Sequence, residues 1–204
     1  MVPRMSNQIW DERYTSPGFM YGVEPNDLVR DEVGRIPPGR VLCLAEGEGR
    51  NAVFLAGRGY DVTAVDFSSV ALRKAERLAR ERGVRVELIE ADLATFDLGT
   101  SAWSGIVSIW AHTPPAIRQR VHAAIPSALR PGGILILEAY RPQQLELGTG
   151  GPKDVTLLPT LADLEAELGA LELLIAREAN REVYEGRLHG GPSATVQIVG
   201  RRRG

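Results

Sequence analysis

The sequence has little cysteine and little histidine, and neither sign of charge dominates it. Its 204 residues include one cysteine and three histidines, and 24 basic against 26 acidic residues leave a formal net charge of −2. One cysteine excludes an internal disulfide framework and, with so few histidines, a cysteine-rich zinc site. A net charge near zero gives no general attraction for the backbone of a nucleic acid. We therefore expect neither a metal site nor a nucleic-acid partner.

Long hydrophobic runs are also missing. The longest apolar stretch, residues 132–140, contains a glutamate and is too short to cross a bilayer. No apolar segment of the kind found in a secretory signal follows Arg4. We therefore expect a cytoplasmic protein without a membrane partner. The 44% hydrophobic and 25% charged residues are typical of a globular protein with a buried core. At about 150 residues per domain the chain is expected to form one domain, and its oligomeric state stays open.

Segments typical of strands and of helices alternate from residue 40 onward. Short apolar runs that suit buried parallel strands cover residues 41–45, 61–65, 84–89, 106–110 and 133–138. Helical patterns are found at residues 51–58, 68–83, 114–129 and 161–168, and two further strand-like segments close the chain. This alternation predicts an α/β fold with a doubly wound sheet over residues 40–204. Residues 1–39, with a short helix near 25–33, are expected to form a lid or cap on the same domain.

Ligands of doubly wound sheets bind beyond the carboxyl ends of the strands, which makes the residues after each strand the first candidates. After the first strand, Gly47-x-Gly49-x-x-Ala52 opens a helix, and Asp66 ends the second strand nineteen residues beyond Gly47. Glycines let a ligand approach the backbone, and a carboxylate accepts hydrogen bonds from ribose hydroxyls. The pattern favours an adenosine-containing ligand over the alternative, a plain tight turn between strand and helix.

Charge helps to distinguish two such ligands. A dinucleotide places its pyrophosphate on this turn and on the helix N-terminus, but Glu46 and Glu48 flank that position. Like charges a few ångströms apart repel by about 1 kcal/mol in water and by more at a lower dielectric. S-adenosylmethionine carries a sulfonium and an ammonium group instead. Arg50 could offset one glutamate, and the balance still favours the sulfonium ligand.

The turn also carries a family resemblance. Residues 41–49, VLCLAEGEG, resemble the first motif of the class I S-adenosylmethionine-dependent methyltransferases, and residues 130–133, RPGG, resemble the turn that enters their fifth strand. The resemblance implies a single doubly wound, seven-stranded, mostly parallel sheet with helices on both faces and a reversed C-terminal strand. Cys43 and Ser104 stand where the family usually has aspartates. Cys43 itself is expected to be a small buried hydrophobe.

The resemblance also implies a cofactor site for S-adenosylmethionine. It places Asp66 on the ribose and Asp92 on the adenine amino group. The full set of residues expected around the cofactor is Glu46, Gly47, Gly49, Arg50, Asn51, Asp66, Phe67, Asp92, Leu93 and Trp110. Glu46 is equally well explained as a solvated side chain, and Glu48 is expected to be solvated.

A narrower resemblance concerns the beginning of the chain. Residues 10–14, WDERY, and the pattern Tyr21-Gly22-x-Glu24-Pro-Asn26 resemble small-molecule methyltransferases related to tellurite-resistance and thiopurine enzymes. This implies a small-molecule methyl acceptor. The aromatic residues expected on the lid or beside the substrate are Trp10, Tyr14, Tyr21 and Tyr140, for which ordinary apolar packing is an equal alternative. The glycine-rich residues 147–154 are expected to form a loop, with a second flap as one interpretation.

Methyl transfer is a direct displacement that needs no metal and no covalent intermediate. His112, after the fourth strand, is the candidate base, and a loop histidine at the start of the next helix is the alternative. His122 is expected to be exposed, and His189 has no evident partner in the sequence. Two other functions stay open at this point: an NAD(P)-dependent oxidoreductase, and a non-catalytic binding module with a methyltransferase-like fold.

Overall fold

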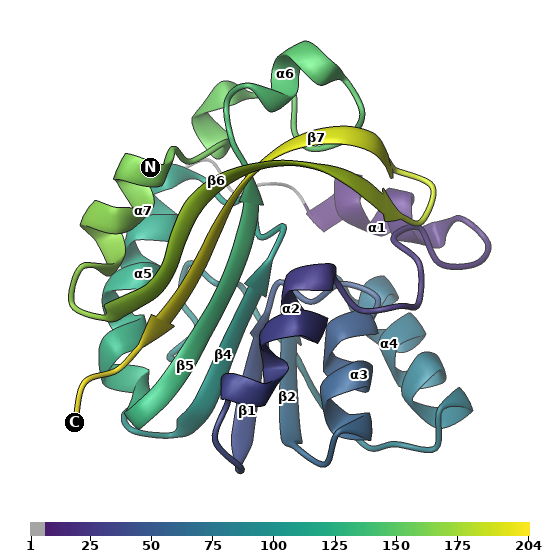
Figure 1. Ribbon diagram of the computed structural model, residues 1–204. Helices are drawn as coiled ribbons and strands as arrows, with labels where there is room; N and C mark the ends of the chain where they lie inside the picture. Colours follow the sequence, from purple (N-terminus) through teal and green to yellow (C-terminus); the bar gives the residue numbers. More distant parts are fainter. Residues whose placement is uncertain (1–6) are drawn as a thin grey trace.

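Seven strands form one sheet in the order β3-β2-β1-β4-β5-β7-β6 in the computed structural model, which describes residues 7–204 (Figure 1). The strands are β1 (Arg40–Leu44), β2 (Asp61–Asp66), β3 (Glu87–Glu90), β4 (Trp103–Ile109), β5 (Leu129–Tyr140), β6 (Glu172–Glu185) and β7 (His189–Arg201). The pairs among β1 to β5 are parallel, whereas β7 is antiparallel to both β5 and β6. The predicted fold class, including the reversed last strand, is confirmed. The expectation at Arg4 lies outside the described residues.

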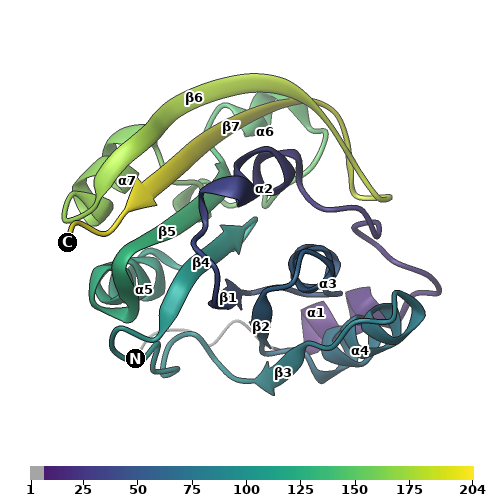
Figure 2. The ribbon, with the colours of Figure 1, turned by 60° about the horizontal axis from the view of Figure 1, so that its bottom comes forward.

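Helices cover both faces of the sheet (Figure 2). They are α1 (Asn7–Thr15), α2 (Asp27–Glu32), α3 (Arg50–Gly57), α4 (Ser69–Glu81), α5 (Pro115–Ala128), α6 (Gln144–Leu147) and α7 (Leu161–Leu168), with short 3₁₀ turns η1 (Val33–Arg35) and η2 (Val155–Leu157). Helices α5 and α7 bury one apolar cluster against the sheet, and α2 and α3 bury another on the opposite face. Cys43 belongs to the second cluster and is fully buried, as expected. Among the described residues, no helix has the length and apolar character needed to span a membrane.

Local sequence signals set several helix boundaries. The Ser68 hydroxyl accepts a hydrogen bond from the Ala71 amide and so caps α4. Thr160 and Asp163 form a capping box at the start of α7. A proline inside a helix usually kinks or ends it, yet α5 continues past Pro126 to Ala128. Because this proline lies in the last turn, it removes only one hydrogen bond before the helix ends.

Ala45, directly after β1, has a left-handed backbone conformation with φ of +48°. This conformation brings Cβ close to a carbonyl oxygen and costs about 1–2 kcal/mol for residues other than glycine. We therefore expect Ala45→Gly to raise the free energy of unfolding by roughly 0.5–1 kcal/mol in urea titrations. The control is Ala56→Gly within α3, where glycine lowers stability by about 1 kcal/mol. A loss of stability in Ala45→Gly would contradict the strain argument.

Candidate functional site

The carboxyl ends of four neighbouring strands bring the predicted site residues to one edge of the sheet. The backbone amide of Glu46, after β1, donates to Val65 in β2, and the Ala91 amide after β3 donates to the Asp66 carbonyl. After β4, the Trp110 amide donates to the Glu138 carbonyl in β5. The loops after β1, β2, β3 and β4 therefore lie side by side, as the fold class predicts.

The glycine turn is tied directly to Asp66. The Gly47 amide donates to Asp66 Oδ2 at 2.8 Å, and the Ser68 amide donates to Oδ1 at 2.9 Å. Burial raises the pKa of Asp66 to about 6, although these hydrogen bonds act in the opposite direction. Gly49 has φ of +90°, and a Cβ there would lie 2.6 Å from the Ala75 Cβ of α4. This glycine therefore permits close packing of the turn against α4.

Glu46 occupies the N-terminus of α3. Its Oε1 accepts hydrogen bonds from the amides of Asn51 and Ala52, both at 2.8 Å. Burial raises the pKa of Glu46 to about 7, and the two amide hydrogen bonds partly oppose that shift. The position where a dinucleotide would place its pyrophosphate already holds a carboxylate of the chain itself.

Glu48 was expected to be solvated, but this expectation is wrong, because the side chain is only 3% exposed. Its carboxylate pairs with Lys74 of α4 at 2.8 Å and accepts the amides of Met20 and Tyr21. Lys74 also donates to two backbone carbonyls of the segment that joins α1 to α2. We call this segment, residues 16–26, the strap. Glu48 and Lys74 fasten the strap beside the glycine turn.

Helix α1 and the strap pack over the start of the site. The Tyr14 side chain is 5% exposed, and a Cβ on Gly47 would lie 2.8 Å from its hydroxyl oxygen. Burial raises the pKa of Tyr14, and the nearby Asp66 raises it further. Trp10 stacks on Tyr14, and the Ser68 hydroxyl donates to Asp11 of the same helix. Of the predicted aromatic residues, Tyr14 thus lies against the glycine turn with Trp10 stacked on it, and closure over a ligand stays a prediction.

The rest of the predicted cofactor set is distributed along the same edge. Asn51 Oδ1 accepts the Asn26 amide at 2.9 Å and so joins α3 to the strap. Asp92 is exposed and caps the turn after β3 through the Ala94 amide, and Leu93 beside it is buried. Phe67 follows β2 and is half-buried. Their roles toward a cofactor stay predictions.

A buried ion network lies on the β4–β5 side of the site. Glu185 Oε2 accepts hydrogen bonds from Arg50 Nη2 at 2.5 Å and from the Trp110 indole at 2.6 Å. Asn26 Nδ2 bridges Glu185 and Glu138, at 2.9 and 2.7 Å. Burial raises the pKa of Glu185, but hydrogen bonds from its neighbours outweigh it and hold the pKa well below the usual range. The network joins α3, the strap and the β6–β7 hairpin.

Aromatic rings continue from this network to β5. Trp110 stacks on Tyr140 with ring centroids 4.2 Å apart, and the His112 ring is stacked with both, at 5.6 Å from Tyr140 and 6.2 Å from Trp110. His112 Nε2 accepts the Tyr140 amide at 3.0 Å, and burial lowers the pKa of His112 to about 3. The ring is therefore neutral, and Nε2 can take a proton only after this hydrogen bond opens. The base role of His112 stays a prediction.

His189 and Glu185 are residues that sequence reasoning missed. Both are more than nine-tenths buried and face each other across the β6–β7 pair, where Glu185 is the register partner of His189. The His189 ring contacts those of Tyr21, Trp110 and Tyr140. No local pattern carries this signal, because it depends on how far a long hairpin reaches over the sheet. Glycine-rich residues 148–151 lie in the expected loop, and Gly150 and Gly151 pack against Tyr140.

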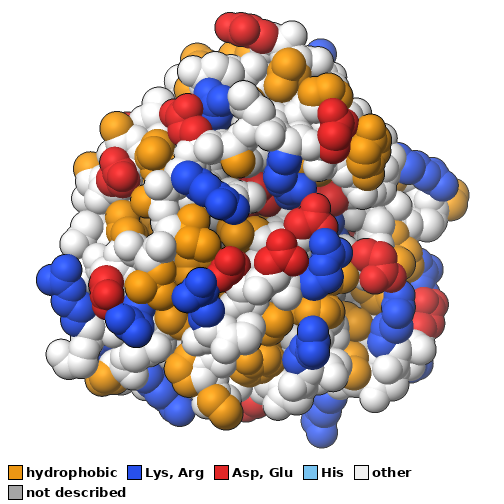
Figure 3. Space-filling model, in the orientation of Figure 1, with side chains coloured by type: hydrophobic (Ala, Val, Ile, Leu, Met, Phe, Trp, Pro, Cys, Tyr) orange, Lys and Arg blue, Asp and Glu red, His pale blue; other side chains and the backbone are white. Residues whose placement is uncertain are grey.

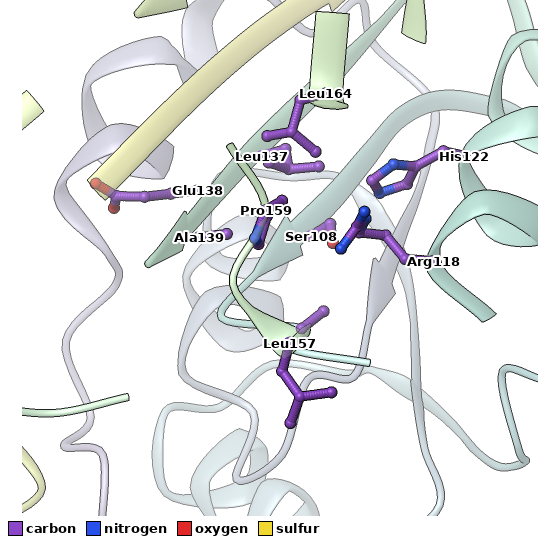
Figure 4. Close-up of a pocket in the computed structure, with 10 residues that line it drawn as sticks. Ser108, Arg118, His122, Leu137, Glu138, Ala139, Leu157, Pro159 and Leu164 are labelled. Carbon is purple, nitrogen blue, oxygen red and sulfur yellow. The ribbon is translucent and has the colours of Figure 1, made fainter. Parts of the chain in front are cut away.

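A second polar cluster lies between α5, α7 and the sheet (Figure 4). His122 was expected to be exposed, but it is 5% exposed and pairs with Glu167 of α7 at 2.6 Å, where Arg118 binds the same carboxylate. The pocket beside it has a volume of about 10 Å³, which is room for roughly one water molecule. Glu138, although it lines this pocket, points its carboxylate away. The cluster joins two helices and is too small to hold a methyl acceptor.

Within residues 7–204, no group of three or more histidine, cysteine, aspartate or glutamate side chains is arranged to hold a metal ion. The edge instead presents carboxylates, backbone amides and aromatic rings. These are the groups that bind an adenosyl ligand in doubly wound folds.

Part of the chain is similar to known methyltransferases. Residues 41–133 match the family model described as a methyltransferase domain. Demethylmenaquinone methyltransferase from Thermus thermophilus is 30% identical over 107 residues, which are 52% of this chain and 49% of that protein. The tRNA 5-carboxymethoxyuridine methyltransferase of Escherichia coli is 30% identical over 108 residues, 50% of this chain and 40% of that one. The chain therefore spans half or less of the length of these curated relatives.

Solved structures agree on the fold. One similar structure comes from work on the conversion of a disulfide bond into a thioacetal group during echinomycin biosynthesis. Its TM-score is 0.76 at 22% sequence identity, and the match covers 97% of this chain and 92% of that one. TehB from Haemophilus influenzae has a TM-score of 0.71 at 16% identity, with 97% and 67% covered. The match over residues 41–133, the methyltransferase relatives and the sheet topology make this chain similar to the class I S-adenosylmethionine-dependent methyltransferases.

Proposed function

We propose that this protein transfers a methyl group from S-adenosylmethionine to a small-molecule acceptor by direct displacement. The observation that carries the proposal is the pairing of Asp66 with the glycine turn, beside a helix N-terminus that Glu46 already fills. A ribose finds a carboxylate there, whereas a pyrophosphate would meet a buried negative charge.

The described residues fit the cofactor in two ways. Asp66 accepts the backbone amides of Gly47, Ser68 and Phe67, and a carboxylate with about four lone-pair sites keeps acceptor capacity for a ribose hydroxyl. Arg50 Nη1 is buried without a hydrogen-bond partner among the described residues, although Arg50 Nη2 is paired with Glu185. A carboxylate, such as the one on the methionine part of the cofactor, would satisfy that guanidinium nitrogen.

The chain's own contribution is binding, alignment and exclusion of water. Bound S-adenosylmethionine supplies a methyl group already activated on a sulfonium centre. The glycine turn, Asp66 and Arg50 would fix its position, while α1 and the strap cover it from the solvent. Alignment of two reactants can lower a barrier by about 7–11 kcal/mol in favourable cases.

Charge distribution supports a small acceptor. Basic and acidic side chains are interspersed over the face in Figure 3, and the net charge is −2. A nucleic-acid substrate gains most of its affinity from clustered positive charge. One relative is named for demethylmenaquinone and another for a uridine of tRNA. The acceptor test therefore includes quinols and tRNA.

Calorimetry with S-adenosylmethionine, S-adenosylhomocysteine and NAD⁺ tests the proposal. We expect both adenosyl compounds to bind and NAD⁺ not to bind. A panel of thiols, phenols, amines, oxyanions, quinols and total tRNA, followed by detection of S-adenosylhomocysteine, then identifies the acceptor class. Binding of NAD⁺ alone would favour an oxidoreductase, and cofactor binding without turnover of any acceptor would favour a non-catalytic module.

A further inference from the structure

If Asp66 and Asp92 hold the cofactor as proposed, the sheet order indicates which part of the site would face the methyl acceptor. Asp66 and Asp92, the expected ribose and adenine partners, follow β2 and β3 at one side of β1. The other end of the cofactor, which carries the methyl group, then extends past β1 toward β4 and β5. Trp110 and Tyr140 lie there, and the β6–β7 hairpin brings His189 to the same place.

His189 has an unusual environment for a buried histidine. Its side chain is 6% exposed, and Nδ1 has no hydrogen-bond partner among residues 7–204. The nearest carboxylate, Glu185, lies 3.7 Å from Nδ1, and Arg50 and Trp110 already occupy the oxygen that faces it. A buried polar atom without a partner costs about 1–3 kcal/mol, so a free ring nitrogen at this edge points to a group that arrives with the substrate.

The surroundings keep this ring neutral at physiological pH. Burial lowers the pKa of His189, Glu185 raises it, and Arg50 and Arg13 lower it further. The charged and titratable groups that face the ring from the elements around it are Glu185, Arg50, Arg13, Tyr21, Tyr140 and His112. A neutral imidazole with a free nitrogen can accept a proton.

We propose that His189 is the catalytic base of the acceptor site. In this step the acceptor atom forms a bond to the methyl carbon, and the sulfur–methyl bond breaks with its electron pair left on sulfur. The proton of the acceptor goes to Nδ1 of His189, which passes it to water after the product leaves. The acceptor therefore belongs to a class that carries its proton at neutral pH, such as an aliphatic thiol or an alcohol.

Two probe acceptors separate this role from a structural one. 2-Mercaptoethanol carries its proton at neutral pH, whereas 4-nitrothiophenol is already ionised and needs no base. We expect His189→Asn, whose side-chain amide keeps a polar atom near the position of Nδ1, to lower the rate with 2-mercaptoethanol by about 10²- to 10⁴-fold. The same variant should change the rate with 4-nitrothiophenol little. Because a ratio of two rates cancels any loss of folded protein, the readout is that ratio.

A pH profile and a spectrum add readouts that packing alone would not move. The wild-type rate with 2-mercaptoethanol should fall at acidic pH as His189 takes up a proton, and His189→Asn should lack this fall. In ¹⁵N spectra of the imidazole rings, recorded with S-adenosylhomocysteine bound, His189 should be neutral at pH 7. His122→Asn is the matched control, since His122 is a buried histidine paired with a glutamate outside the site.

The outcomes divide clearly. A selective loss with 2-mercaptoethanol in His189→Asn, absent in His122→Asn, supports the base role. An equal loss with both probes, no loss, or a His189 ring protonated at pH 7 overturns it. A wild-type protein that binds S-adenosylhomocysteine but methylates neither probe also overturns it, and leaves the cofactor proposal intact. Failure to bind S-adenosylhomocysteine defeats the proposed function itself.

Discussion

Replacement of Asp66 by asparagine is expected to weaken the binding of S-adenosylhomocysteine about 10- to 150-fold, the equivalent of 1.5–3 kcal/mol for hydrogen bonds to a charged group. The reason is that only the carboxylate can accept from Gly47, from Ser68 and from a ribose at the same time. Asparagine replaces one oxygen with a donor, which then faces a backbone amide. Isothermal titration calorimetry measures the change.

The same strand supplies the control. Asp61 begins β2 at the opposite edge of the sheet, where its side chain is 77% exposed, so Asp61→Asn should leave the affinity unchanged. Affinity should also fall as the pH drops through about 6, because Asp66 takes up a proton there and loses acceptor capacity. Asp66→Asn should lack this part of the pH dependence. Equal affinity of Asp66→Asn and wild type would remove Asp66 from the cofactor site.

Glu138→Ala is expected to lower the free energy of unfolding by about 3–5 kcal/mol, because it removes the carboxylate that compensates the largely buried Arg181 guanidinium. The Glu138 side chain is fully buried and accepts hydrogen bonds from Asn26, Arg181 and Gln197. Arg181 binds it through two nitrogens and would retain only partial compensation from Asp27 and Glu185. Urea or guanidinium unfolding measures the loss.

Two further variants make this expectation specific. Glu81→Ala removes a glutamate that is 57% exposed and paired only within its helix, and should change stability by no more than about 0.5 kcal/mol. Glu138→Gln keeps the shape and one acceptor oxygen, and should fall between wild type and alanine. A Glu138→Ala protein as stable as the Glu81→Ala protein would show that the network contributes nothing to folding.

Much of the fold followed from local pattern. The run at residues 61–65 predicted β2, which is Asp61–Asp66, and the helix predicted at 161–168 is α7. Both segments carry their signal within a few residues, as an apolar run or as a capped amphipathic stretch. The helix α1 had no such signal, because aromatic and charged side chains alternate in it without one apolar face.

The environments of several acids and histidines were not predictable in the same way. Glu48 is buried because Lys74 reaches it from α4, and His122 is buried because Glu167 reaches it from α7. Each partner lies more than twenty residues away in the chain. Sequence alone shows a charged residue in a turn or in a helix, and only packing decides whether an ion of opposite sign is placed beside it.

The carboxylate of Glu46 at the start of α3 has a consequence for selectivity in a mixture of metabolites. ATP and NAD⁺ share their adenosine with the expected methyl donor, and a pocket that recognised adenosine alone would be open to inhibition by these nucleotides. Here the anchoring point for their phosphates has a permanent intramolecular occupant, held by two amides. Any phosphorylated competitor would first have to displace that occupant, whereas a donor without phosphate enters with the helix end undisturbed.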